Sequence, residues 1–404
     1  MTTTTAAPVF PPTPMGTALD QVMFNTNSCL VVRDATTHKV IYDHNGSVPF
    51  APASTQKLLV AAAALDRLGP DYRFVTSLVS ESAPVGGQVG NLWLVGGGDP
   101  LLATAEYATH LAQRPATAAY ATTPISALAD ALVAKGVRSV RNGVHADDSR
   151  YSTLRYLPTW VPNLNQGEFD VGPIGALEVD QGLDSWGPAK ITADPAAHGA
   201  GVVARLLAER GVAAAPGGDS TAPAGAVVLA RIPSVPLAQI VTAMLQGSDN
   251  QIAEMLVREL DRKAGGSGTT AGGVAQVMAA AARLGLPVSG LSMVDGSGLS
   301  PTNRVTCRTL LGALELGDTA RLSALTAALP VAGVSGLMYD FFRGTPLAGR
   351  LAAKGGYITG VAGLVGRLSG GATPVHFAFV SNGDLPFGVG LGMEKHIVEA
   401  LATG

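Results

Sequence analysis

Charged residues are scarce in this sequence. Only 14% of its 404 residues are Asp, Glu, Lys or Arg, against roughly 25% in an average soluble chain. Because 47% of the residues are hydrophobic, this low charge does not indicate disorder. The 27 basic and 30 acidic residues give a net charge of −3, without the basic excess with which nucleic-acid binders hold phosphates. Nucleic acid is therefore not expected as a partner.

Long hydrophobic runs are also missing. No run approaches the roughly 20 apolar residues that a membrane-spanning helix needs. The first residues, MTTTTAAPVFPPTP, lack the basic start and apolar stretch of a secretory signal. We interpret residues 1–23 as an extended Thr/Pro-rich linker. We expect an exported domain whose signal or anchor segment is not included in this sequence.

Cysteine and the common metal and phosphate motifs are rare or absent. Cys29 and Cys307 are the only cysteines, too few for a thiolate metal site. They form one bridge or remain two buried thiols, and the sequence leaves both readings open. None of three motifs occurs: the H-E-x-x-H zinc motif, the G-x-x-x-x-G-K loop and the G-x-S-x-G elbow. We expect no metal and no cofactor.

Turn-forming residues are abundant, with 50 Gly and 26 Pro, so the chain is rich in loops. Residues 28–33 and 39–43 have the composition and spacing of a β-hairpin. Residues 54–68 predict a helix that ends at Gly69, and its apolar residues on nearly all sides indicate burial. Further helices are predicted at 237–246, 251–263, 273–284, 306–316 and 393–402, and strands at 362–369 and 375–381.

The predicted secondary structure changes between residues 75 and 230, where short strands and short helices alternate with Gly/Pro turns. The length favours two to three domains, at roughly 150 residues each. We therefore predict a discontinuous first domain, 24–74 and 231–404, interrupted by an inserted domain, 75–230. The predicted fold class is α/β (α+β), with an antiparallel sheet flanked by helices and an inserted mixed α/β domain.

One short motif places an amine beside a hydroxyl. Ser54-Thr55-Gln56-Lys57 is the only Ser-x-x-Lys in the chain, and residues three apart share one face of a helix. Ser54 is expected to open the helix, where free N–H groups favour negative charge on a bound oxygen. Burial would lower the pKa of Lys57, so that a neutral amine takes the serine proton. The alternative is a helix cap beside a solvated lysine.

Two further motifs follow along the chain. Ser248-Asp249-Asn250 precedes a helix, and its alternative interpretation is a capping box between Ser248 and Gln251. Lys354-Gly355-Gly356 opens a strand-like stretch, where glycine lets a substrate backbone approach the strand edge. By itself this third motif is only a turn.

Taken together, Ser-x-x-Lys, Ser-Asp-Asn and Lys-x-Gly form the ordered set described for penicillin-binding proteins and β-lactamases. The flanking sequence resembles one family, the D-alanyl-D-alanine carboxypeptidase/endopeptidases among the class C low-molecular-mass penicillin-binding proteins. The resemblance covers most of residues 28–381. Its blocks are PASTQKLLVAAAALDRLGPDYRF, LVGGGDPLL, the Asp147-Asp148-Ser149 strand end, SDNQIAEML and DGSGLSPTNRVT. The 190 residues between Lys57 and Ser248 match the large insertion of that family.

The resemblance implies a transpeptidase-like fold and a role for each motif residue. Ser54 is the expected nucleophile and Lys57 its base, while Ser248 relays a proton to the leaving D-alanine. Asn250 is expected to bind the substrate amide, and Lys354 to supply the third-motif cation. The N–H groups of Ser54 and Tyr357 would form the oxyanion hole beside Gly355 and Gly356.

The implied partners are a peptidoglycan stem peptide and β-lactam antibiotics, and the implied location is the periplasm or cell wall. Asp147 or Asp148 is expected to contact a diaminopimelate amino group, or else to be a surface turn acid. The DGSGLS segment is interpreted as a structural element beside the cleft. A β-lactamase or esterase is the least favoured reading, because no glutamate-bearing loop can be assigned to it. The oligomeric state and the balance of carboxypeptidase and endopeptidase activity are left open.

Gly355 departs from the family pattern, which has Thr or Ser there. The missing hydroxyl would remove a hydrogen bond to the terminal carboxylate of the substrate. Such a charge-assisted bond contributes about 1.5 to 3 kcal/mol, so efficiency is expected to fall about 10- to 150-fold. The departure also motivates an alternative function, a scaffold that binds peptidoglycan without turnover.

Overall fold

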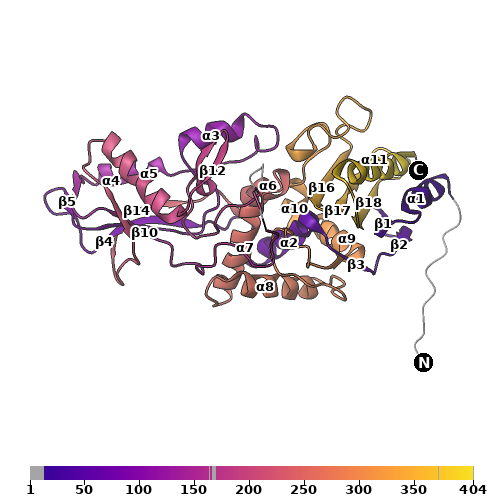
Figure 1. Ribbon diagram of the computed structural model, residues 1–404, viewed down its shortest axis with the longest axis horizontal. Helices are drawn as coiled ribbons and strands as arrows, with labels where there is room; N and C mark the ends of the chain where they lie inside the picture. The colour runs from indigo at the N-terminus through magenta and orange to yellow at the C-terminus, as the bar shows by residue number, and fades with distance from the viewer. Residues whose placement is uncertain (1–12, 163, 166–169, 372, 404) are drawn as a thin grey trace.

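The computed structural model describes residues 13–162, 164–165, 170–371 and 373–403. The helices are α1 (Pro14–Met23), α2 (Lys57–Leu68), α3 (Ala105–Ala112), α4 (Ser126–Ala134), α5 (Pro195–Glu209), α6 (Leu237–Gln246), α7 (Asn250–Lys263), α8 (Thr270–Arg283), α9 (Cys307–Glu315), α10 (Ser323–Ala327) and α11 (Phe387–Thr403). Short 3-10 turns are η1 (Ala53–Gln56), η2 (Asp180–Gly182), η3 (Leu316–Asp318), η4 (Ala320–Leu322) and η5 (Gly336–Met338). The molecule is elongated, with one large sheet toward each end and helices between them (Figure 1).

The strands form two five-stranded sheets and several short pairs. They are β1 (Ser28–Asp34), β2 (Val40–His44), β3 (Pro49–Phe50), β4 (Val75–Ser80), β5 (Gln88–Val89), β6 (Leu92–Val95), β7 (Leu102–Ala103), β8 (Thr123–Pro124), β9 (Ser139–Val140), β10 (Val144–Asp147), β11 (Leu183–Trp186), β12 (Ala189–Ile191), β13 (Pro216–Asp219), β14 (Val227–Pro233), β15 (Val305–Thr306), β16 (Leu351–Ile358), β17 (Val361–Leu368) and β18 (Val375–Asn382).

The first sheet joins the two ends of the chain. Its order is β16-β17-β18-β1-β2, and all neighbouring strands are antiparallel. The predicted hairpin of β1 and β2 is therefore confirmed, as are the predicted strands at β17 and β18. Because β16 lies at one edge, the Lys354-Gly355-Gly356 motif that it carries lies on an edge strand.

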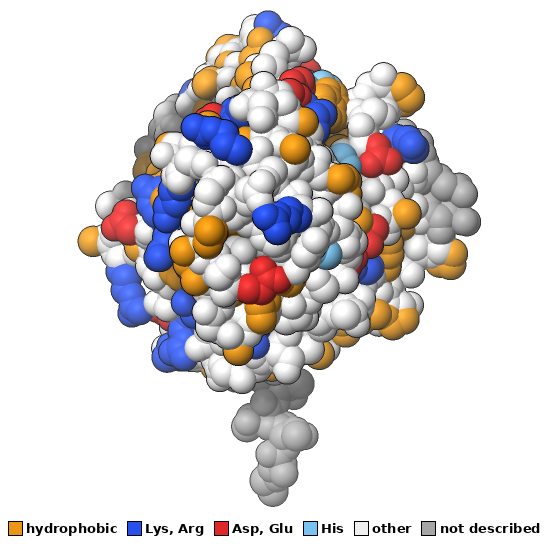
Figure 2. All heavy atoms as spheres, turned by 90° about the vertical axis from the view of Figure 1, so that its left-hand side faces the viewer, with side chains coloured by type: hydrophobic (Ala, Val, Ile, Leu, Met, Phe, Trp, Pro, Cys, Tyr) orange, Lys and Arg blue, Asp and Glu red, His pale blue; other side chains and the backbone are white. Residues whose placement is uncertain are grey.

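The second sheet is mixed and lies between residues 75 and 233. Its order is β13-β10-β6-β4-β14; β10 runs parallel to β6 and β13, whereas β4 is antiparallel to β6 and β14. The α/β class with an antiparallel sheet and an additional mixed sheet is thus confirmed, while the exact domain boundaries stay a prediction. At this end of the molecule, hydrophobic side chains are exposed mostly in small separate groups (Figure 2).

The central helix α2 is buried on nearly all sides, as predicted. Its residues from Lys57 to Leu65 are all buried, and they pack against α6, α7, α8 and α9. Four consecutive alanines, 61–64, leave room for close helix packing because they have small side chains. The helix ends where predicted, at Gly69 with φ +84°, a left-handed conformation that glycine adopts without strain.

The amino-terminal prediction is wrong for residues 14–23, which form helix α1 instead of an extended linker. Thr13 caps the helix, because its side chain accepts a hydrogen bond from the Gly16 N–H at 2.9 Å. Pro14 at the first position has the fixed φ that a helix start requires. Leu19 and Met23 are buried in the core beside the first sheet and α11. Residues 1–12 of the predicted linker lie outside the described residues.

A disulfide joins Cys29 on β1 to Cys307 at the start of α9, with 6.0 Å between their Cα atoms. This settles the alternative that the sequence left open. Structural disulfides are typical of proteins in oxidising compartments. Among the described helices, none is both long and apolar enough to cross a membrane.

We expect the double variant Cys29→Ala/Cys307→Ala to unfold more easily than the wild type. The bridge spans 278 residues and restricts the unfolded chain, which contributes up to about 5 kcal/mol in the chain-entropy description. Urea unfolding should show a lower midpoint for the variant, and wild type with a reductant should match it. An unchanged midpoint in both experiments would contradict a stabilising role.

Candidate active site

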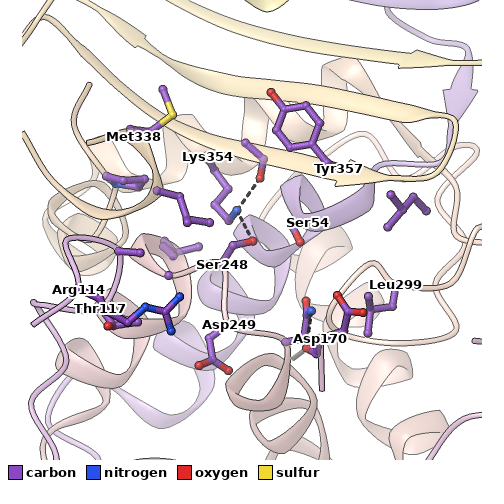
Figure 3. A pocket seen from close by; sticks show the side chains of 18 of the residues that line it. Ser54, Arg114, Thr117, Asp170, Ser248, Asp249, Leu299, Met338, Lys354 and Tyr357 are labelled. Atoms are coloured by element: carbon purple, nitrogen blue, oxygen red, sulfur yellow. Dashed lines mark hydrogen bonds between the residues drawn. The ribbon is translucent and has the colours of Figure 1, made fainter. Parts of the chain in front are cut away.

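Residues of all three motifs line one cavity of about 920 Å³. Its lining includes Ser54, Ser248, Asn250, Lys354 and Tyr357. Figure 3 shows Ser54, Ser248 and Lys354 close together from three different segments, with Lys354 reaching down to the Ser248 hydroxyl. The structure thus brings together three motif segments, 54–57, 248–250 and 354–356, which are more than 100 residues apart in the sequence.

Lys57 lies beneath the cavity, fully buried, and its amine contacts three oxygens. Nζ lies 2.7 Å from Ser54 Oγ, 2.6 Å from Asn250 Oδ1 and 2.8 Å from the Ser297 carbonyl oxygen. Burial lowers the pKa of Lys57 to about 7, against an upward pull from nearby carboxylates. Near neutral pH, a neutral amine can therefore accept the Ser54 proton.

Ser54 is presented by the 3-10 turn η1, which is a correction to the expected uniform helix from 54 to 68. The α-helix proper starts at Lys57, and Ala53, just before the serine, has φ +47°. Non-glycine residues in this region are strained and occur preferentially at functional sites. Ser54 therefore projects from a tight turn rather than from a regular helix end.

Gly356 allows β16 to run directly against this turn. A Cβ atom at Gly356 would lie 2.9 Å from Ser54 N and 2.8 Å from Thr55 N. No larger residue fits there without a backbone shift, which is the physical reason for glycine. The neighbouring Gly355 is different, since a Cβ there would meet only Tyr357 Cε2, at 3.6 Å.

Ser248 does not cap helix α7, so the capping-box interpretation is wrong. The cap is Asp249, whose Oδ1 accepts a hydrogen bond from the Ile252 N–H at 2.9 Å. Ser248 lies one residue before the cap, with φ +54°, and its Oγ accepts a hydrogen bond from Lys354 Nζ at 2.8 Å. The serine hydroxyl is thus linked to the third motif.

Lys354 is the second buried amine of the site, with 2% of its surface exposed. Besides Ser248 Oγ, its Nζ contacts the Gly355 carbonyl oxygen at 2.5 Å. Burial holds the pKa of Lys354 well below its ordinary value, and the charge of Lys57 acts in the same direction. Each amine thus contacts a different serine hydroxyl. Lys57 contacts that of Ser54, and Lys354 contacts that of Ser248.

The DGSGLS segment lies beside the cavity and supplies one of the oxygens on Lys57. Its Ser297 carbonyl is aimed at Lys57 because Glu254 Oε1 accepts hydrogen bonds from Gly296 N at 2.9 Å and Ser297 N at 2.7 Å. Burial raises the pKa of Glu254 to about 7. Sequence reasoning missed Glu254, although its spacing of four residues from Asn250 on one helix face was an available signal.

A second buried carboxyl, Glu394 on α11, was also missed. It accepts a hydrogen bond from the Tyr357 hydroxyl, and burial raises the pKa of Glu394 to about 8. The Tyr357 ring packs edge-on against Phe387, with 4.9 Å between centroids. No motif contains Glu394, so only its place in the fold reveals it.

Neither Asp147 nor Asp148 is among the described residues that line the cavity. Asp147 is buried and accepts hydrogen bonds from Ser149 N at 3.0 Å and Ala222 N at 2.8 Å. Asp148 accepts from Leu177 N at 2.7 Å and pairs with Arg155. Both carboxylates bind loops of the protein itself, and Asp147 is too buried for a surface turn acid. The contact with a diaminopimelate amino group stays a prediction.

The comparisons of this chain with known family profiles, proteins and structures agree on one family. The profile of the D-Ala-D-Ala carboxypeptidase 3 (S13) family matches residues 17–199 and 188–403. Carboxypeptidase DacB of Mycolicibacterium smegmatis is 32% identical over 97% of this chain and 84% of its own length. D-alanyl-D-alanine carboxypeptidase of Actinomadura sp. strain R39 is 30% identical over 90% and 79%. The structure of penicillin binding protein 4 (dacB) of Haemophilus influenzae is similar, with a TM-score of 0.80, 22% identity and coverage of 96% and 99%.

We expect acylation of Ser54 by an activated ester such as p-nitrophenyl acetate to depend on a group of pKa about 7. The rate should rise about tenfold per pH unit below that value and level off above it, because only the neutral amine of Lys57 accepts a proton. Burst kinetics from pH 5 to 9, with Ser54→Ala as background, measure this. A rate independent of pH would exclude Lys57 as the base.

Proposed function

We propose that Ser54 is the nucleophile of this chain, which belongs to the D-Ala-D-Ala carboxypeptidase 3 (S13) family. The chain is thus a serine-type carboxypeptidase. The observation that carries this proposal is the contact of the buried Lys57 amine with Ser54 Oγ at 2.7 Å. An uncharged amine at this distance is a general base already in hydrogen-bond reach of the hydroxyl proton. The substrate that we propose is a peptidoglycan stem peptide ending in D-Ala-D-Ala.

In the acylation step, Ser54 Oγ attacks the carbonyl carbon of the penultimate D-alanine while its proton moves to Lys57 Nζ. The N–H groups of Ser54 and Tyr357 are the proposed donors to the resulting oxyanion. Gly356 supports this assignment, since it lets β16 approach within contact distance of the Ser54 backbone. Asn250, already in contact with Lys57, would bind the substrate amide through its side chain.

In the second half of acylation, the C–N bond breaks and the leaving D-alanine nitrogen takes a proton. We propose that Ser248 relays this proton. Its Oγ passes its own proton to the nitrogen and takes one in turn from Lys354 Nζ, which donates a hydrogen bond to it at 2.8 Å. Water then hydrolyses the ester on Ser54 and releases the shortened peptide. The whole cavity measures about 920 Å³, near the upper end of the range for small-molecule sites, and this size supports additional endopeptidase cleavage of cross-links.

β-Lactams are the proposed inhibitors, acylating the same serine. The similar fold of penicillin binding protein 4 from Haemophilus influenzae has been solved with a novel β-lactam. We propose that the enzyme works outside the cytoplasm, in the periplasm or cell wall. The Cys29–Cys307 disulfide supports this location.

Fluorescent penicillin should label the wild type and fail to label Ser54→Ala. The wild type should also release D-alanine from a synthetic D-Ala-D-Ala peptide, and Ser54→Ala should not. Thermal unfolding of both proteins provides the control for folding. Labelling that survives the substitution would remove Ser54 as nucleophile, and labelling without D-alanine release would favour the binding scaffold.

The substitution Gly355→Thr should raise kcat/KM for the D-Ala-D-Ala peptide about 10- to 150-fold. The added hydroxyl would supply a hydrogen bond of about 1.5 to 3 kcal/mol to the terminal carboxylate, and the strand has space for its Cβ. Gly355→Ala is the matched control, because it adds the Cβ without the hydroxyl. Equal rates for wild type, Gly355→Ala and Gly355→Thr would mean that another group holds the carboxylate.

A further inference from the structure

The second motif is held by side chains of the inserted segment, residues 75–230. We propose that Tyr120 and Gln181 are positioning residues, which fix Ser248 and Asn250 by binding the carboxylate of Asp249. This inference rests on the proposed function of the same site and assigns the insertion a role in positioning Ser248 and Asn250. The insertion would complete the catalytic geometry rather than only widen the cavity.

The Asp249 carboxylate connects two parts of the protein. Its Oδ1 caps helix α7 through Ile252 N. Its Oδ2 accepts hydrogen bonds from Gln181 Nε2 at 2.6 Å and Tyr120 Oη at 3.1 Å. Gln181 is oriented in turn by Tyr107, whose hydroxyl donates to Gln181 Oε1 at 2.7 Å. One carboxylate oxygen of Asp249 thus binds the helix, and the other oxygen binds side chains of the insertion.

The backbone around Ser248 needs such support. Ser248 has φ +54°, a strained conformation for a non-glycine residue, which persists only where the surrounding structure enforces it. Tyr120 lies directly against the preceding residue, because a Cβ at Gly247 would lie 2.0 Å from its hydroxyl oxygen. The Tyr120 hydroxyl therefore touches both residues that flank Ser248.

The next two side chains, those of Asn250 and Gln251, are also hydrogen-bonded to residues of the insertion. Asn250 Nδ2 donates to the Asp170 carbonyl oxygen at 2.8 Å, leaving Asn250 Oδ1 directed at Lys57. Gln251 Oε1 accepts from Gly172 N at 2.7 Å, and its Nε2 donates to Glu178 at 2.5 Å. Three consecutive side chains after Ser248 therefore have their partners in the insertion.

Direct substrate contact is the competing explanation, because Tyr120 and Gln181 also line the cavity. The two explanations differ in what the variants change. Loss of positioning affects the attack on any acylating agent and loosens the backbone near Ser248. Loss of a substrate contact raises KM for the peptide alone.

The test compares Tyr120→Phe and Gln181→Ala with the matched control Tyr72→Phe. The control loses the same kind of bond, from a tyrosine hydroxyl to a carboxylate, since Tyr72 donates to Glu259 Oε1 at 2.7 Å near the other end of α7. Amide hydrogen exchange of residues 244–256 reports on backbone order without requiring activity. Acylation by fluorescent penicillin and the kcat and KM for a D-Ala-D-Ala peptide report on the chemistry.

We expect faster exchange in residues 244–256 and about tenfold slower penicillin acylation in Tyr120→Phe and Gln181→Ala, with kcat reduced more than KM is raised. Tyr72→Phe should match the wild type in all three measurements. Wild-type exchange and acylation in the first two variants would overturn the proposal, as would a raised peptide KM alone. If wild type itself is not acylated by penicillin, the proposed function fails, while the exchange data still decide the positioning role.

Discussion

The site depends on the burial of one amine, Lys57 Nζ, among oxygens from three distant parts of the chain. Removing an amine from water is costly unless its hydrogen bonds are replaced. Ser54, Asn250 and Ser297 replace them from η1, α7 and the DGSGLS segment. The hydrogen bonds of the lysine are therefore satisfied only when these three elements meet, so the arrangement proposed to activate the serine is also the one that lets the lysine be buried.

Within the described part of the chain, no carboxylate forms a direct ion pair with this amine. Glu254 lies close enough to raise the pKa of Lys57, yet its Oε1 hydrogen bonds go to the backbone N–H groups of Gly296 and Ser297. A direct salt bridge would hold Lys57 protonated and unfit to act as a base. Glu394 acts on Lys354 from the other side, raising its pKa against burial. Burial and remote carboxylates thus oppose each other, and the pKa of Lys57 stays near 7.

Much of the fold could be predicted from the sequence, because the signals are local. Gly69 ends α2, the hairpin at β1 and β2 follows from composition, and the later helices show in runs of Ala and Leu. The three motifs could be found because each lies within four residues. Glu394 and the Glu254 contacts could not, since they depend on pairing between elements far apart in sequence. The role of Asp148 was missed for the same reason: a strand-end acid has the same local sequence whether it binds substrate or the N–H groups of a distant loop.

Helix α7 explains how the predicted insertion, residues 75–230, can share the candidate active site with the rest of the chain. Asn250 at its start reaches Lys57, whereas its later turns are bound by the insertion. Glu259 on α7 is fully buried and accepts hydrogen bonds from Arg150 and Tyr151. The fully buried Arg258 donates to carbonyl oxygens of the insertion, including that of Ser152 at 3.0 Å. Because a buried charge with its partner removed is strongly destabilising, these contacts resist separation. The predicted insertion is therefore fixed to the helix that carries the second motif, and residues from both parts of the chain line the cavity around the start of that helix.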